Sequence, residues 1–198
     1  MPVNPAAGVG ILLVQTLFHL ATFILVLRFL LHFSNADYYN PITQSLVKVT
    51  NPLVRPLQGI LRPMGRFDLA TLILALVVKL VAMLILLSMA GYGMAPIPNM
   101  LFGALGALVS VILDIYFFAL IISIILSWIA PNANHPGALL VYQLTEPVMA
   151  PIRRVLPSLG GLDLSPIFLF LGISILEMLL IGTLVQLAGM PVAMVMGV

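Results

Sequence analysis

Four long apolar segments constrain the fold of this chain more than any other feature. They lie at about residues 9–33, 69–90, 101–129 and 166–188. Each is long enough to cross the roughly 30 Å hydrocarbon core of a bilayer, which takes about 20 helical residues. Charged residues make up 7% of the chain, against about 25% in an average soluble domain. The sequence therefore predicts an all-α membrane protein with four transmembrane helices.

The chain also carries an internal duplication. The stretch from Thr145 to Pro166 reads TEPVMAPIRRVLPSLGGLDLSP, and a weaker copy, TNPLVRPLQGILRPMGRFDLAT, lies 95 positions earlier at Thr50 to Thr71. We therefore expect two repeats, at residues 1–95 and 96–198, each built as span, polar junction and span. Because an even number of crossings separates the two junctions, the repeats should have parallel and not inverted topology.

Basic residues predict the orientation. Six of the eight lysines and arginines lie in the two junctions. Lysine and arginine are enriched in short cytoplasmic loops, so we expect the junctions on the cytoplasmic side and both termini outside. No basic residue precedes the first apolar run, which argues against a cleaved signal peptide, and residues before Gly8 are expected to form a short tail.

The first junction has an amphipathic pattern. Its apolar residues recur at helical spacing and its basic residues fall on the opposite side: Ile42, Leu46, Val49, Leu53, Leu57 and Ile60 against Lys48, Arg55 and Arg62. This pattern is typical of a helix at the membrane surface, and packing against the protein's own helix ends is the alternative. Pro52 and Pro56 each lack an amide donor, so we expect a kink or a break there, with Thr50 and Thr145 as N-caps.

The second junction ends in a helix start signal. Ser165 is expected to cap the fourth span, Pro166 to occupy its first position, and Asp163 to lie near the positive end of the helix dipole. The first copy keeps the equivalent Asp68 but has neither the serine nor the proline. The second span should therefore have the less sharply specified start.

The second junction, preceded by SWIAP at 127–131, resembles the signature of the YggT family, also called YlmG, of bacterial and plastid membrane proteins. The motif positions are Thr145, Glu146, Pro147, Pro151, Arg153, Arg154, Pro157, Gly160, Asp163, Ser165 and Pro166. The resemblance implies a multi-pass protein of the bacterial inner membrane without an established enzymatic activity. Family members are linked to cell division and nucleoid distribution, to assembly of membrane complexes in plastids, and to osmotic stress tolerance. The first copy departs from the motif at Arg62, Ala70 and Thr71.

Five ionisable residues fall inside the predicted spans. Arg28 lies about 8 Å from the inner end of its helix and is expected to snorkel to the interface. The other four, His19, Lys79, Asp114 and Glu177, lie at depths of about 18–22 Å and are expected to form one buried polar layer, with Lys79 paired to Glu177 or Asp114. Three roles stay open for this layer: an ion pair that fixes helix register, an ion or proton path, or pairing with a partner chain.

Common catalytic and cofactor motifs are missing from the sequence. It has no HExxH, GxSxG, Walker loop or dinucleotide fingerprint, and no cysteine. Because His19 and His32 lie about 20 Å apart along one helix, they cannot share a metal, and we expect no cofactor, metal or nucleic-acid contact. Arg153 and Arg154 could hold an anionic lipid headgroup, and the simpler interpretation is that they set topology and pair with Glu146 or Asp163.

Together these observations predict a non-enzymatic inner-membrane organising or assembly factor, whose junctions contact lipid headgroups, other membrane proteins or a second copy of the chain. This interpretation comes from the family resemblance more than from the physical chemistry of the residues. The alternative is a small ion or osmolyte pathway for osmotic stress tolerance, lined by the buried polar layer and formed between protomers.

Overall fold

The computed structural model describes residues 5–91, 93, 95–130, 134–155 and 163–189. The helices are, in chain order, α1 (Pro5–Phe33), α2 (Pro41–Ile60), α3 (Leu69–Met89), α4 (Ile97–Ile129), α5 (Pro136–Val155), α6 (Ser165–Leu176), the π-helical turn η1 (Glu177–Ile181) and α7 (Gly182–Ala188). Apart from an isolated β-bridge between Met64 and Phe67, regular structure in these residues is helical. The prediction of an all-α fold is confirmed.

Four helical segments are long and apolar enough to cross a membrane: Gly8–Phe33, Leu69–Met89, Ile97–Ile129 and Ser165–Ala188. The fourth is a continuous rod made of α6, η1 and α7. The third span begins four residues before the predicted start, and α1 begins at Pro5, where a tail was expected. Both differences have one reason, because a proline in the first turn of a helix lacks only a donor that the turn would leave unpaired.

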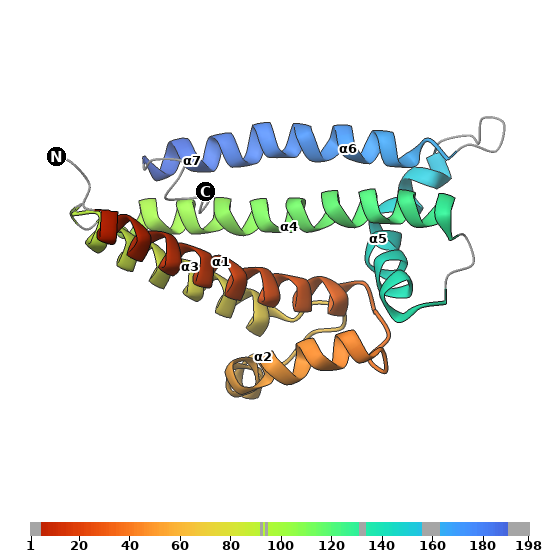
Figure 1. Ribbon diagram of the computed structural model, residues 1–198, viewed down its shortest axis with the longest axis horizontal. Helices are drawn as coiled ribbons and strands as arrows, with labels where there is room; N and C mark the ends of the chain where they lie inside the picture. Colours follow the sequence, from red (N-terminus) through yellow and green to blue (C-terminus); the bar gives the residue numbers. More distant parts are fainter. Residues whose placement is uncertain (1–4, 92, 94, 131–133, 156–162, 190–198) are drawn as a thin grey trace.

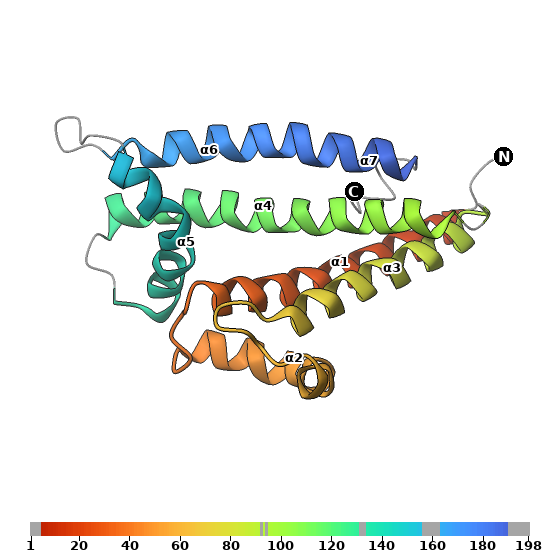
Figure 2. The ribbon, with the colours of Figure 1, turned by 180° about the vertical axis from the view of Figure 1, so that it is seen from behind.

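Helix α4 lies at the centre of the molecule. Figure 1 shows α1 and α3 on one side of it and the α6–α7 rod on the other, and the view from behind agrees (Figure 2). Helices α1 and α4 run in the same direction, and α3 and α6 run back the opposite way. The two repeats therefore have parallel topology, as predicted, and both junctions lie at the same end of the molecule.

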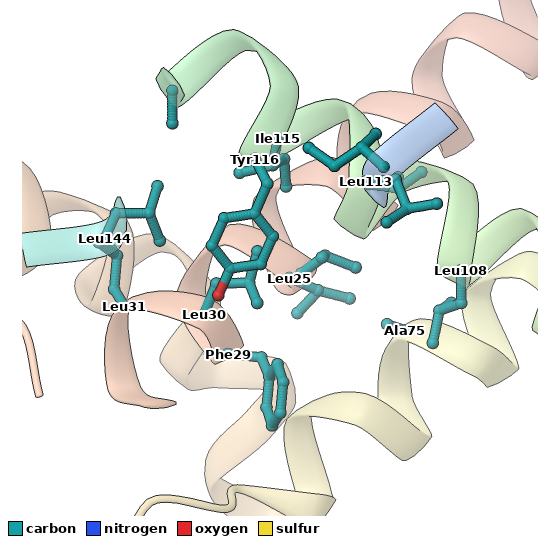
Figure 3. Packing of buried hydrophobic residues seen from close by; sticks show 14 of the residues in the cluster. Leu25, Phe29, Leu30, Leu31, Ala75, Leu108, Leu113, Ile115, Tyr116 and Leu144 are labelled. Carbon is teal, nitrogen blue, oxygen red and sulfur yellow. The ribbon is translucent and has the colours of Figure 1, made fainter. Parts of the chain in front are cut away.

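The main hydrophobic core lies where α1, α3 and α4 meet near the junction end. Leu25, Phe29 and Leu30 of α1 pack with Tyr116 of α4, and Ala75 of α3 packs nearby against Leu108 (Figure 3). Leu144 of α5 extends this cluster into the second junction. Since Leu144 and the α1 residues belong to different repeats, the core joins the two halves as well as the helices within the first.

The junction helices α2 and α5 run through their prolines without a break. Pro52 and Pro56 lie inside α2, and Pro147 and Pro151 lie inside α5. The expected break is therefore wrong, and the expected kink is visible as a change in direction of α2, whose second half is seen end-on in Figure 1. A bend of this kind lets a helix continue after a proline has removed one backbone hydrogen bond.

The predicted N-caps at Thr50 and Thr145 are also wrong, because both residues lie in mid-helix. Thr50 Oγ1 donates to Leu46 O at 2.7 Å, and Thr145 Oγ1 donates to Val141 O at 2.9 Å. Such bonds to the preceding turn favour bending of a helix, and here each one lies two residues before the first internal proline. Threonine and proline together shape the bend.

The real caps of α2 and α5 lie ten residues earlier. Asn40 Oδ1 accepts a hydrogen bond from Ile42 N at 3.0 Å, and His135 Nδ1 accepts one from Gly137 N at 3.2 Å. Asn40 and His135 are 95 positions apart, and so are Ile42 and Gly137. The first and last residues of α2 and α5 are separated by the same 95 positions. The duplication therefore extends to the capping of the junction helices.

Candidate functional site

Arg28 ties the first span to its junction. The residue is 8% exposed, and its Nη1 donates to Thr50 Oγ1 at 2.6 Å, to Asn51 Oδ1 at 3.0 Å and to Val47 O at 3.4 Å. The prediction that Arg28 snorkels to the interface is wrong. The physical reason is that α2 lies against the end of α1 and supplies oxygen acceptors in place of water, as a buried charge requires.

Asp68 begins the second span of the first repeat. Its Oδ1 accepts from Thr71 N at 3.3 Å, and its Oδ2 accepts from Thr71 Oγ1 at 2.6 Å and from Gln58 Nε2 at 2.7 Å. At 2% exposure this carboxylate is among the most buried polar groups of the protein. The expectation that this helix start is less sharply specified is therefore wrong, because Thr71 completes the cap that the missing serine was expected to make.

Asp163 holds the equivalent place in the second repeat. Its Oδ1 accepts from Ser165 N at 2.9 Å and its Oδ2 from Arg153 Nε at 2.9 Å. Arg153 Nη1 also donates to Glu146 Oε2 at 3.1 Å, so the expected pairing of Arg153 is found with both carboxylates. Ser165 is the first residue of α6 and Pro166 the second, so the residue at the N-cap position is Leu164 and the predicted serine cap is wrong.

The surroundings of Asp163 favour its ionised form. Partial burial disfavours the carboxylate, but the hydrogen bonds from Ser165 and Arg153 outweigh burial and lower the pKa of Asp163 below its ordinary value of 3.8. The ion pair with Arg153 is open to solvent, so its contribution to stability is reduced by screening.

Two cavities mark the same place in the two repeats. The first cavity, of about 360 Å³, is lined by Arg28, Thr43, Val47, Gln58 and Asp68 among others. The second cavity, of about 440 Å³, is lined by Ser123, Tyr142, Arg153 and Asp163 among others. Ser123, Tyr142, Arg153 and Asp163 follow Arg28, Val47, Gln58 and Asp68 by 95 positions.

The arginine that lines the cavity therefore comes from a different helix in each repeat, whereas the aspartate occupies the same position in both. In the first repeat it comes from the span, as Arg28, and in the second from the junction helix, as Arg153. Gln58 occupies the position of Arg153 and makes the equivalent contact: the amide Nε2 of Gln58 donates to Asp68 Oδ2, as the guanidinium Nε of Arg153 donates to Asp163 Oδ2. Sequence reasoning noted the aspartates but missed Gln58, although the 95-residue offset alone would have paired it with Arg153.

Hydrogen bonds also join the two junctions to each other. Asn40 Nδ2 donates to Pro136 O at 2.7 Å, Asp37 N donates to Gln143 Oε1 at 3.1 Å, and Ser34 Oγ donates to Leu144 O at 3.4 Å. These contacts connect the loop after α1 with α5. The junctions are therefore in direct contact, although they belong to different repeats.

The remaining motif residues have several roles. Glu146 pairs with Arg153, and Thr145, Pro147 and Pro151 lie inside α5, where Thr145 Oγ1 donates to Val141 O. Arg154 is exposed at the end of α5. Pro157 and Gly160 lie outside the described residues.

The predicted buried polar layer is only partly assembled. Lys79 is 5% exposed, and His19 has a buried Nδ1 that lacks a hydrogen-bond partner among the described residues. His19 lies within electrostatic reach of both Lys79 and Asp114, so it is the residue that connects these two members of the predicted layer. Asp114 is exposed beside Ser110, whose Oγ lies 3.5 Å from its Oδ2.

Glu177 does not join this group. It is exposed and begins η1, which contacts α4, whereas Lys79 lies on α3. In the parts of the chain that the structure describes, the ion pairs are those of Arg153 with Glu146 and Asp163, so the predicted pair between Lys79 and a carboxylate is not formed. For Glu177 the reason is the position of α4 between the α1–α3 pair and the fourth span (Figure 1), whereas Asp114 lies on α4 itself and is exposed.

Comparison with known proteins gives one family and several relatives. The CCB3/YggT family matches residues 8–89 and 102–184, which correspond to the two halves of the chain. An uncharacterised protein of Pseudomonas aeruginosa is 47% identical over 183 residues, covering 92% of this chain and 93% of that protein. The uncharacterised protein YggT of Escherichia coli is 32% identical over 166 residues, covering 84% and 86% respectively. No solved structure matches.

Asp163 should give the protein a measurable acid dependence. A carboxyl whose pKa is lowered by folding stabilises the folded state above its unfolded pKa of 3.8, and this contribution is lost as the pH falls through the lower folded pKa. We expect the thermal unfolding midpoint of wild type to exceed that of Asp163→Asn at about pH 6 and to approach it below about pH 3. Asp37→Asn, a change at an exposed loop carboxyl, is the control. A constant difference between wild type and Asp163→Asn at every pH would contradict the assignment.

Proposed function

The chain belongs to the CCB3/YggT family of membrane proteins, and from that premise we propose that it is a non-enzymatic organising or assembly factor of the bacterial inner membrane. Its partners would be membrane proteins that serve the cell envelope, cell division or a membrane complex. The proposal rests on the exposed apolar face of α2, which lies beside a row of basic side chains at the end of the molecule that carries both junctions.

Helix α2 presents three different faces. Thr43, Thr50 and Val54 are buried and turn toward the protein. A second face is apolar and open, with Ile42 at 44% exposure, Val49 at 67%, Leu53 at 61% and Ile60 at 82%. These residues fall on one side of a helix with about 3.6 residues per turn. Most of the predicted apolar stripe is thus free of the protein's own helix ends, which favours the membrane surface over internal packing.

The third face of α2 is basic. Lys48 and Arg55 are exposed and line a shallow groove with Asn51, Pro52 and Pro56. A helix with one open apolar face and one basic face suits the boundary between hydrocarbon and headgroups, where a membrane-bound partner can contact both. In α5 the equivalent of Val49 is the buried Leu144, so α2 is the freer of the two junction helices.

The proposed orientation places both junctions in the cytoplasm, because six of the eight basic residues lie there. The chain contains no cysteine, so single cysteines can report on sidedness. We expect a membrane-impermeant maleimide to label Pro98→Cys in intact spheroplasts, and Arg154→Cys only after permeabilisation. Both positions are exposed. Labelling in the reverse order would overturn this orientation.

Contact with a protein partner can be tested directly at α2. We expect a photo-reactive side chain at Leu53 to give one discrete protein adduct in living cells, because this position is open on the apolar face. The adduct should weaken severalfold when Lys48 and Arg55 are both changed to glutamine, since the basic face would no longer contribute. Phe118, which is exposed on α4 within a span, is the matched control position. The same adducts at Phe118, or adducts with lipid alone at Leu53, would contradict the organising role.

An ion or osmolyte pathway is the second candidate function. The observation in its favour is the placement of His19 close to Lys79 and Asp114 within the membrane, with a buried Nδ1 on His19 that has no hydrogen-bond partner in the described part of the chain. Charged side chains inside spans are costly, by roughly 2.5–3.5 kcal/mol on insertion scales, and often serve transport. One chain of four helices encloses little space, so such a pathway would form between copies of the protein.

A flux assay separates the two candidates. If the protein is a pathway, ion or osmolyte flux into protein-containing liposomes should fall about tenfold or more in Lys79→Met and stay at the wild-type level in Glu177→Gln, because Glu177 lies outside the group. Absence of flux through correctly folded wild type would contradict the pathway. A loss in Glu177→Gln equal to that in Lys79→Met would contradict the role of this group.

A further inference from the structure

The first cavity contains two opposite charges that are not paired with each other. Arg28 and Asp68 both line it, and both are more than nine-tenths buried. The ion pairs in the described chain involve Arg153 and not these two residues. A cationic and an anionic side chain are therefore held apart around one space of about 360 Å³, which is within the usual range for a small-ligand site.

Thr43 adds a third polar side chain to the lining of this cavity. Thr43 is 6% exposed, and its buried Oγ1 lacks a hydrogen-bond partner among the residues that the structure describes. Buried hydroxyls nearly always find a partner, because leaving one unsatisfied is costly. Its Oγ1 has almost no accessible surface, but Thr43 lines the cavity, so a rotation about χ1 would bring the hydroxyl to a bound molecule that supplies the missing contact.

Both charged groups keep unused hydrogen-bonding capacity. The bonds that Arg28 makes with the described chain all use Nη1, which leaves the N–H groups of Nε and Nη2 for another acceptor. Asp68 accepts hydrogen bonds from Gln58 and Thr71, and a carboxylate has about four acceptor sites, so one remains. The cavity thus offers donors from Arg28 and an acceptor from Asp68.

The second cavity differs in this respect. There Arg153 Nε and Asp163 Oδ2 lie 2.9 Å apart, so the two charges satisfy each other, and both side chains are open to solvent. The duplication therefore supplies an internal comparison. The chain has one cavity with separated buried charges, and one in which the equivalent aspartate, Asp163, is paired with Arg153.

We propose that the first cavity binds a zwitterionic phosphoethanolamine group, with its phosphate held by Arg28 and the Thr43 hydroxyl and its ammonium by Asp68. A phosphate accepts charge-assisted hydrogen bonds from a guanidinium, and an ammonium donates to a carboxylate. A bound anion without a cation would be repelled by Asp68, and a bound cation without an anion would be repelled by Arg28. A group that carries both charges can pair with both Arg28 and Asp68, whose formal charges cancel.

Such a group has two sources, the headgroup of phosphatidylethanolamine and a soluble phosphoethanolamine. The lipid source is consistent with the open apolar face of α2, because that face would lie at the headgroup boundary beside the cavity. Binding of either is separate from partner contact through α2, since Thr43 lies on the protein-facing side of the helix and Leu53 on the open side.

Lipid retention by the full-length purified protein tests the proposal. Native mass spectrometry would follow binding of phosphatidylethanolamine, phosphatidylglycerol and phosphatidylcholine added in equal amounts, with soluble phosphoethanolamine as competitor. We expect phosphatidylethanolamine to bind at least about tenfold more tightly than either other lipid, because phosphatidylglycerol has no cation and the choline cation has no N–H donor. Competition by soluble phosphoethanolamine would show that the group suffices, and binding of the lipid without such competition would assign the site to the headgroup in its membrane setting.

Matched variants locate the site. Arg28→Gln and Asp68→Asn should each weaken phosphatidylethanolamine binding about tenfold, and Thr43→Val, which keeps the side-chain shape, about threefold. Asp163→Asn, the same change 95 positions later, should bind as wild type. Size-exclusion elution and thermal unfolding would establish that each variant is folded, and Thr43→Val keeps the test decisive if either charge variant fails to fold. Equal retention of the three lipids, wild-type binding by folded Thr43→Val, or an equal loss in Asp163→Asn would overturn the proposal.

Discussion

The burial of Arg28 against α2 is the interaction on which the first repeat depends. A guanidinium near the end of a membrane span must reach water or be surrounded by polar atoms, because the cost of an unsatisfied buried charge is high. Here α2 provides those atoms through Thr50, Asn51 and the carbonyl of Val47. That contact fixes α2 across the end of α1, and Gln58 of α2 then reaches Asp68 at the start of α3. Three helices of the first repeat therefore meet around one charged side chain.

The second repeat connects its junction helix to its returning span through a different residue. A serine occupies the place of Arg28, and the arginine has moved to the junction helix, where it reaches the retained aspartate directly. The duplication thus preserves an aspartate at the start of the returning span and a hydrogen-bond donor beside it, while the charge of that donor differs. This difference makes the two halves unequal: the first keeps buried charges and an open apolar helix face, and the second has paired charges and a largely covered junction helix.

Much of this fold could be predicted from the sequence because it depends on local or periodic features. The lengths of the apolar segments predict the four spans, and the 95-residue offset predicts two repeats of parallel topology. The wrong predictions concern features that are determined by contacts between helices. Counting residues gave the depths of Lys79 and Glu177, but depth says nothing about which helix lies between them, and α4 separates them. Prolines at 52 and 56 suggested a break, yet tertiary contacts hold α2 as one bent helix. The burial of Arg28 and its hydrogen-bond partners could not be predicted without knowing where α2 lies.

The π-helical turn at Glu177–Ile181 changes which side chains of the fourth span share a face. A π turn accommodates one residue more than a regular helix, while the helix on either side keeps its direction. Side chains after Ile181 are therefore rotated by about 100° around the rod, relative to the positions that an uninterrupted α-helix would give them. Ala188 of α7 is buried in one cluster with Ala104 and Ala107 of α4. The turn thus helps to determine which face of α7 packs against the central helix.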